Sequence, residues 1–233
     1  MINFLQATIP FPSIDIGVGL AEGPGDVVAS LQILLVLTVL TLAPAILILM
    51  TSFTRTVIVL SFIRNAVGTN QVPPNQVLIG LALFLTAFIM GPALSSVYTE
   101  AVLPYINGEL GLEEMWEAGL APVREFMFKH TREKDLEMFI VMQGGERPAS
   151  PEDVDTFTLI PSFVISELKT AFQLGFVIFI PFLVIDMVVA STLMGMGMMM
   201  LPPVMISLPF KILLFVLVDG WHLIVRSLLA SFS

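Results

Sequence analysis

The chain has 233 residues, of which 56% are hydrophobic and only 12% are charged, and its net charge is −9. Ordinary soluble domains carry roughly 25% charged residues, so this composition indicates a membrane protein or a subunit buried among partners. The absence of cysteine excludes disulfides and thiolate sites, and ten scattered basic residues under a negative net charge argue against nucleic-acid binding. Phosphate-binding glycine loops and HExxH or GxSxG motifs are missing, so we expect no enzyme, no cofactor and no metal site.

Residues 1–29 form the first predicted segment. They contain Asp15, Glu22 and Asp26, no basic residue, and frequent proline and glycine. A secretory signal peptide has a basic start and an uninterrupted apolar stretch. Because this segment has neither, we expect a flexible N-terminal segment.

Residues 30–98 predict a first apolar helical hairpin. Residues 30–50 carry no charge over about the 20 residues that a helix needs to cross a bilayer, and residues 77–98 form a second apolar run. Arg55 and Arg64 lie between the two runs. The positive-inside rule therefore places these two arginines on the cytoplasmic side.

The rest of the chain divides into a polar and an apolar part. Residues 99–157 contain thirteen acidic and five basic residues, which predicts an acidic, polar helical insertion facing water. Residues 158–233 predict a second apolar helical hairpin, with a methionine-rich loop at 194–203 between its helices. Hydropathy alone thus predicts four membrane-length helices.

The last predicted helix carries charges on one side. At about 100° per residue, Lys211, Asp219, His222 and Arg226 fall on one narrow stripe, opposite a face of leucine, isoleucine, valine and phenylalanine. A charge exposed to lipid costs at least ~2.5–3.5 kcal/mol. We therefore expect this polar helix stripe to face a partner helix or an aqueous lumen, as in a wall segment of an assembly.

Two further charges lie inside apolar runs. Glu167 and Lys169 are two residues apart, so on a helix they point to different sides and cannot satisfy each other. Glu167 then needs another base, and Lys211 needs an acid. We predict that Glu167 and Lys211 form an ion pair, within one subunit or between neighbours; the alternative is that each reaches an interface separately.

The stretch MGMGMMMLPP, residues 194–203, has three interpretations. Its methionines are ordinary core residues, or Met194, Met196 and Met198 bind Cu(I) through their thioethers, or loops from several subunits close a pore. We favour the third, because unbranched thioether chains repack easily around changing shapes. Glycine adds backbone freedom, and Pro202 and Pro203 keep the next helix from extending into the loop.

Long motifs of the chain resemble the FliP family of flagellar biosynthetic proteins, which is shared with the matching subunit of virulence type III secretion systems. The motifs include "PAILILMTSFTRTVIVLSFIRNAVGTNQVPPNQ", "IPSFVISELKTAFQLGFVIFIPFLVIDMVVAS", "MGMGMMMLPP" and "LPFKILLFVLVDGW". The resemblance runs from about residue 30 to the C-terminus. "TSFTR" and "REFMFKHTREKDLEMF" favour the flagellar branch.

This resemblance implies an all-α fold, in which long kinked helical hairpins form a wall segment of a ring-like or helical membrane-associated oligomer. The implied assembly contains five copies of the subunit together with FliQ-like and FliR-like subunits, contacts membrane lipid and further export-apparatus proteins, and binds no nucleic acid. It lies in the bacterial inner membrane at the flagellar basal body, with much of it on the periplasmic side. Its implied function is that of a protein export gate, which forms a channel for unfolded protein substrates.

The resemblance also assigns residues. It places the pore constriction at Met198, Met199 and Met200, with Met194 and Met196 beside it. It makes Glu167 and Lys211 an ion pair between neighbouring subunits. The open alternatives are the virulence-type homologue of the same subunit and, in a different class, a small-solute or Cu(I) membrane transporter.

Overall fold

The computed structural model describes residues 24–69, 71–144, 148, 150–198 and 200–232, and its regular structure within these ranges is helical throughout. This confirms the predicted all-α class. The helices are α1 (Pro24–Met50), α2 (Phe53–Val67), α3 (Asn75–Ile89), α4 (Gly91–Ser96), a π-helical turn (Val97–Val102), α5 (Leu103–Ile106), α6 (Leu112–His130), α7 (Glu133–Met142), a 3₁₀ turn (Pro151–Asp153), α8 (Thr156–Gly195), α9 (Pro203–Leu217) and α10 (Gly220–Ala230).

The chain forms two compact units, residues 1–43 and residues 44–233. The described part of the first unit is residues 24–43, the larger part of α1. There the hydroxyl groups of Thr38 and Thr41 each donate a hydrogen bond of 2.7 Å to the carbonyl one helical turn earlier. These bonds satisfy polar groups on a helix that otherwise exposes large apolar side chains.

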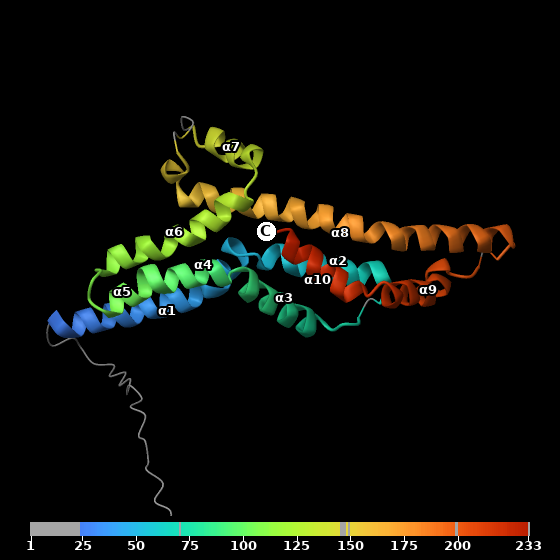
Figure 1. Ribbon diagram of the computed structural model, residues 1–233, viewed down its shortest axis with the longest axis horizontal. Helices are drawn as coiled ribbons and strands as arrows, with labels where there is room; N and C mark the ends of the chain where they lie inside the picture. Colours follow the sequence, from blue (N-terminus) through green and yellow to red (C-terminus); the bar gives the residue numbers. More distant parts are fainter. Residues whose placement is uncertain (1–23, 70, 145–147, 149, 199, 233) are drawn as a thin grey trace, which may run out of the picture. The chain divides into compact units, whose positions relative to one another are not determined.

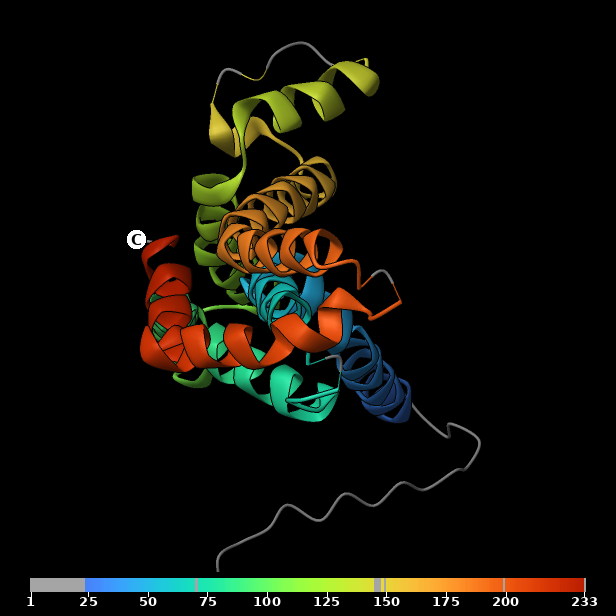
Figure 2. The same cartoon turned by 90° about the vertical axis from the view of Figure 1, so that its right-hand side faces the viewer.

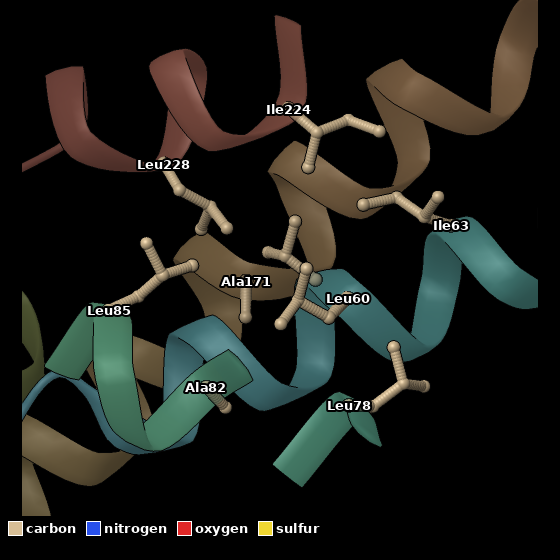
Figure 3. Close-up of a cluster of buried hydrophobic side chains, with 9 residues drawn as sticks. Leu60, Ile63, Leu78, Ala82, Leu85, Ala171, Ile224 and Leu228 are labelled. Atoms are coloured by element: carbon tan, nitrogen blue, oxygen red, sulfur yellow. The ribbon is translucent and has the colours of Figure 1, made fainter. Parts of the chain in front are cut away.

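The centre of the second unit is the packing of α2 along α8, which both views of the ribbon show (Figures 1 and 2). Val59, Leu60 and Ile63 lie on one face of α2, as their spacing of three and four residues requires. Figure 3 shows how side chains from α3, α8 and α10 point into the same cluster. Its buried members are Val59, Leu60, Ile63, Leu78, Ala82, Leu85, Ala171, Ile224 and Leu228.

A second apolar cluster attaches the acidic insertion to the beginning of α8. It contains Met50, Met127, Val154, Leu159 and Phe163. Polar contacts flank it. The guanidinium of Arg132 donates to Thr170 Oγ1 (3.0 Å) and to Gln173 Oε1 (3.1 Å), and Ser166 Oγ donates to Asp135 Oδ2 (2.7 Å). The insertion is therefore docked on α8 by both apolar and hydrogen-bonded contacts.

The apolar runs are broken more often than hydropathy predicts. Only α8, with 40 residues, is by itself long and apolar enough to cross a membrane among the described helices. Up to four spans result if each bent pair of helices counts as one, with bends of 65° between Leu40–Met50 and α2, 60° at the end of α3, and 64° between α9 and α10. At the second break Pro92 is the second residue of α4, and proline cannot donate the hydrogen bond that would continue α3.

Candidate functional site: the methionine loop and two buried ion pairs

The methionine loop begins where α8 ends, through a Schellman motif. The N–H of Met198 donates to Leu193 O (2.9 Å), and the N–H of Gly197 donates to Met194 O (3.0 Å). Gly197 has φ +76°, the left-handed conformation that this motif requires and that glycine adopts without strain. At the other end α9 begins at Pro203, as predicted from the double proline.

The methionine side chains of this loop lie open on the single chain. Met194, Met196 and Met198 are about half exposed or more, and Met200 is 99% exposed; Met199 lies outside the described residues. The four described methionines are therefore not buried in a core of their own chain. They are an uncovered, flexible apolar surface at the end of the α8–α9 hairpin.

Below the loop, α8 and α9 are joined by a carboxylate clasp, which we define as Asp186, Ser207 and Lys211. Lys211 Nζ donates to Asp186 Oδ2 at 2.6 Å, and Ser207 Oγ donates to Asp186 Oδ1 at 2.5 Å. The Lys211 side chain is buried, whereas that of Asp186 is 32% exposed. Both carboxylate oxygens are thus engaged, which fixes the orientation of Asp186.

A second ion pair lies deeper, between Arg55 of α2 and Glu167 of α8. Arg55 Nε donates to Glu167 Oε2 at 2.9 Å, and Arg55 Nη2 pairs with Glu167 Oε1. This is the bidentate geometry that suits a guanidinium and a carboxylate. Arg55 is 2% exposed and Glu167 is fully buried, so each charge depends on the other for stabilisation.

The same arginine also binds the C-terminal residues. Arg55 Nη1 donates to Ser231 O (2.8 Å) and Ser231 Oγ (3.0 Å), and its Cζ lies 3.8 Å from the centre of the Phe232 ring. The Phe232 ring in turn contacts Phe126, stacked at 6.1 Å, and His130, edge-on at 5.1 Å. One side chain therefore connects α2, α8 and the C-terminal residues, and through Phe232 also α6.

His130 is expected to make stability depend on pH. Burial, followed by the positive charges of Arg55 and Lys129, lowers the pKa of His130 from 6.5 to about 4. The folded state thus binds fewer protons than the unfolded state between these values, so its contribution to stability is complete above pH 6.5 and is lost as the pH falls towards 4. Urea unfolding in detergent across this window should show a flatter pH dependence for His130→Gln than for the parent.

The other histidine provides the control for this measurement. His222 is exposed on α10, so His222→Gln should keep the parent's pH dependence of unfolding. Both substitutions leave every carboxyl group of the chain in place, so the comparison isolates the histidines. Equal slopes for the parent and His130→Gln would contradict the assignment to His130.

The predicted pairing of Glu167 with Lys211 does not occur within the chain. Glu167 binds Arg55, and Lys211 binds Asp186. The expectation that each charge needs an opposite charge holds, but the partners within the chain are Arg55 and Asp186. Pairing between neighbouring subunits is not tested by a single chain and stays a prediction. The expected divergence of Glu167 and Lys169 is confirmed, because Glu167 is buried and Lys169 exposed.

The polar helix stripe is also corrected, since residues 203–233 do not form one helix. The helix is interrupted at Val218 and Asp219, where Asp219 adopts φ +50°. The angular positions calculated for one continuous helix therefore do not apply. His222 and Arg226 remain one turn apart and exposed on α10, Asp219 is exposed at the break, and Lys211 is buried on α9. None of Asp219, His222 and Arg226 makes a side-chain hydrogen bond or ion pair to the described residues.

Sequence reasoning missed Arg55 and Asp186 as partners, although a signal for both was present. The apolar parts of the chain contain few charges, and these include Arg55, Glu167, Asp186 and Lys211. Because isolated charges are costly there, each invites a search for the opposite charge. For metals, the described residues include no group of three or more histidine, aspartate or glutamate side chains able to hold an ion.

A family model and individual relatives both match this chain over most of its length. The model of the FliP family matches residues 36–228. The flagellar biosynthetic protein FliP of Bacillus subtilis (strain 168) is 60% identical over 212 residues, which cover 91% of this chain and 96% of that protein. The protein of the same name from Aquifex aeolicus (strain VF5) is 48% identical over an alignment of 234 residues, covering 100% of this chain and 98% of the relative. The chain therefore belongs to the FliP family.

Proposed function

We propose that the chain is a core subunit of the flagellar type III protein export gate. Several copies surround a channel through which unfolded substrates leave the cell interior, and the methionine loops meet on its axis as a compliant seal. The gate lies in the inner membrane at the flagellar basal body, with much of the assembly on the periplasmic side.

The flagellar role rests on family membership. Three relatives that are 48–60% identical over most of the chain bear the name of a flagellar biosynthetic protein. This level of identity favours the flagellar branch over the virulence branch. The export activity itself is inferred from the family resemblance of the motifs around residues 158–217.

The seal rests on one observation, the exposure of the methionine loop. A single chain leaves Met194, Met196, Met198 and Met200 uncovered at the end of a long hairpin. Apolar side chains on a turn of this kind are unfavourable in water and need a covering surface. Equivalent loops from other copies provide that surface, and flexible thioethers pack together without a fixed geometry.

Exposed apolar helices support assembly with other subunits. The outer surfaces of α8 and α9 are covered with large apolar side chains, which include Phe176, Val177, Met187, Val188, Phe210, Leu213, Val216 and Leu217. Soluble monomers rarely expose contiguous apolar patches of more than a few hundred Å². In the proposed gate these faces contact sister subunits, five copies in all, together with FliQ-like and FliR-like subunits and lipid.

Removing the thioethers tests the seal. Replacing Met198, Met199 and Met200 with alanine is expected to raise the ion conductance of membranes that contain the assembled gate, because alanine leaves space on the axis, while substrate export continues. The measurement is ionic current through reconstituted gates alongside secretion of a flagellar substrate. Met138→Ala and Met142→Ala are matched controls, since these methionines are exposed on α7, outside the loop.

Conductance equal to that of the parent would contradict the seal. Stoichiometric Cu(I) binding by the purified chain, lost in the same triple variant, would instead favour a metal transporter, because soft thioethers select Cu(I).

A further inference from the structure

The burial pattern of α9 is the reverse of that of a normal amphipathic helix. Its sequence, PVMISLPFKILLFVL, is almost entirely apolar, yet its only buried residues are Ser207 and Lys211. Its large aliphatic side chains are at least partly exposed. Apolar contacts between α9 and α8 lie at the far end of α9, where Phe215 packs against Phe182. Nearer the methionine loop, the buried residues of α9 are polar.

Both buried residues of α9 bind the same carboxylate. Ser207 and Lys211 are four residues apart and so lie on one face of the helix, and each donates to a different oxygen of Asp186. Among the described residues, these are the only hydrogen bonds by which side chains connect α9 to α8. The clasp thus fixes the distance and rotation of the first half of α9 relative to α8, while Phe215 packs against Phe182 at the far end.

Apolar packing above the clasp is sparse. Beyond Phe182, the only buried residue of α8 is Leu193. The methionine loop follows directly and connects the two helices. Its backbone hydrogen bonds join Gly197 and Met198 to the end of α8, whereas Pro202 O accepts a bond of 3.1 Å from the N–H of Met205 in α9. The position of the loop's second half therefore depends on where α9 is held.

We infer that Asp186 is a positioning residue of the seal: it holds α9 against α8, and thereby places the second half of the methionine loop. Asp186 does not touch the loop, and it acts through Ser207 and Lys211. This inference rests on the proposed sealing function of the loop, but its structural part concerns the α8–α9 hairpin alone.

Spin-label distances test the structural part. The chain contains no cysteine, so Ser191→Cys on α8 and Val204→Cys on α9 introduce the only thiols, both at exposed positions. Double electron–electron resonance on assembled gates, with labelled chain diluted in unlabelled chain, then reports the separation within one hairpin. We expect one narrow distance distribution for the parent, a broad one for Asp186→Ala, and an intermediate one for Ser207→Ala.

Two variants separate positioning from general damage. Exchanging the charges, Asp186→Lys with Lys211→Asp, should partly restore the narrow distribution and lower the ion leak below that of Asp186→Ala. Lys169→Ala on the same helix should match the parent, because Lys169 is exposed and has no side-chain partner among the described residues. If Asp186→Ala does not assemble, the distance distributions and ion leak of Ser207→Ala and of the charge-exchange variant are compared with those of the parent instead.

Conductance distinguishes failure of the inference from failure of the proposed function. A leak in Asp186→Ala with an intact methionine loop supports the inference. If the methionine triple variant leaks but the Asp186 and Ser207 variants keep the parent's distances and conductance, the inference is wrong and the seal stands. If distances broaden while neither set of variants leaks, the clasp positions α9 and the seal is wrong.

Discussion

Replacing Arg55 with alanine is expected to lower the free energy of unfolding by about 3–5 kcal/mol, the usual cost of leaving one member of a buried ion pair without its partner. Glu167 is fully buried and takes both of its strong hydrogen bonds from this guanidinium. The variant also loses the bonds to Ser231 and the contact with Phe232. Chemical unfolding in detergent, followed by circular dichroism, measures the loss.

Arg226→Ala is the matched control, because Arg226 is exposed on α10 and has no ion-pair partner among the described residues. Surface substitutions of this kind usually change stability by less than about 0.5 kcal/mol. The double variant Arg55→Met with Glu167→Leu removes both charges and should be more stable than Arg55→Ala. A cost for Arg55→Ala no larger than for Arg226→Ala would show that the pair does not stabilise the subunit.

Gly220→Ala is expected to cost about 1–3 kcal/mol or more, the range for forcing extra atoms into a packed site. A Cβ at Gly220 would overlap Cε2 and Cδ2 of the Phe215 ring and lie 2.8 Å from its Cγ. The ring has little room to move, because Trp221 packs edge-on at 5.4 Å and Phe182 lies at 6.4 Å. We expect a lower melting temperature and a change in the fluorescence of the adjacent Trp221.

Gly80→Ala provides the comparison for a glycine in open space. A Cβ at Gly80, in the interior of α3, meets nothing within 4 Å, and alanine favours a helix over glycine by roughly 0.5–1 kcal/mol. This variant should therefore match or exceed the stability of the parent. If the two glycine variants behave alike, the contact of Phe215 with Gly220 does not hold the bend between α9 and α10.

The helical class and the beginning of α9 could be predicted from the sequence, because they depend on local properties. Long uncharged runs leave no alternative to helix in an apolar environment, and a double proline interrupts a helix wherever it occurs. The turn at Gly195 and Gly197 follows from the same local chemistry. Backbone preferences of a few adjacent residues were sufficient for these features.

The breaks inside apolar runs depend on tertiary packing and were missed for that reason. Asp219 and Gly220 interrupt a strongly apolar segment without any proline. The close approach of Phe215 to Gly220 becomes visible only in three dimensions. A calculation of angular positions that assumes one straight helix therefore places charges of α9 and α10 on one stripe, although the two helices point in different directions.

The charge partners were missed because pairing depends on which helices are neighbours. Arg55 and Glu167 are 112 residues apart, and their contact requires that α2 pack along α8. The positive-inside rule concerns the side of the membrane on which Arg55 lies and not its partners, and in the structure protein surrounds Arg55 almost completely. Counting the few charges in the apolar parts reduces the number of possible ion pairs, but it does not show which of these pairs form.

The length of α8 sets a limit on how the subunit sits in a bilayer. At 1.5 Å per residue its 40 residues extend about 60 Å, twice the roughly 30 Å of a hydrocarbon layer. Even at a tilt of 40°, the upper end of observed tilts, the helix extends beyond the hydrocarbon layer by about half of the layer's thickness. If α8 crosses a bilayer, one part of it lies outside the lipid, and the N-terminal half, with its buried serines and Glu167 packed against α2 and α6, is the half suited to that position.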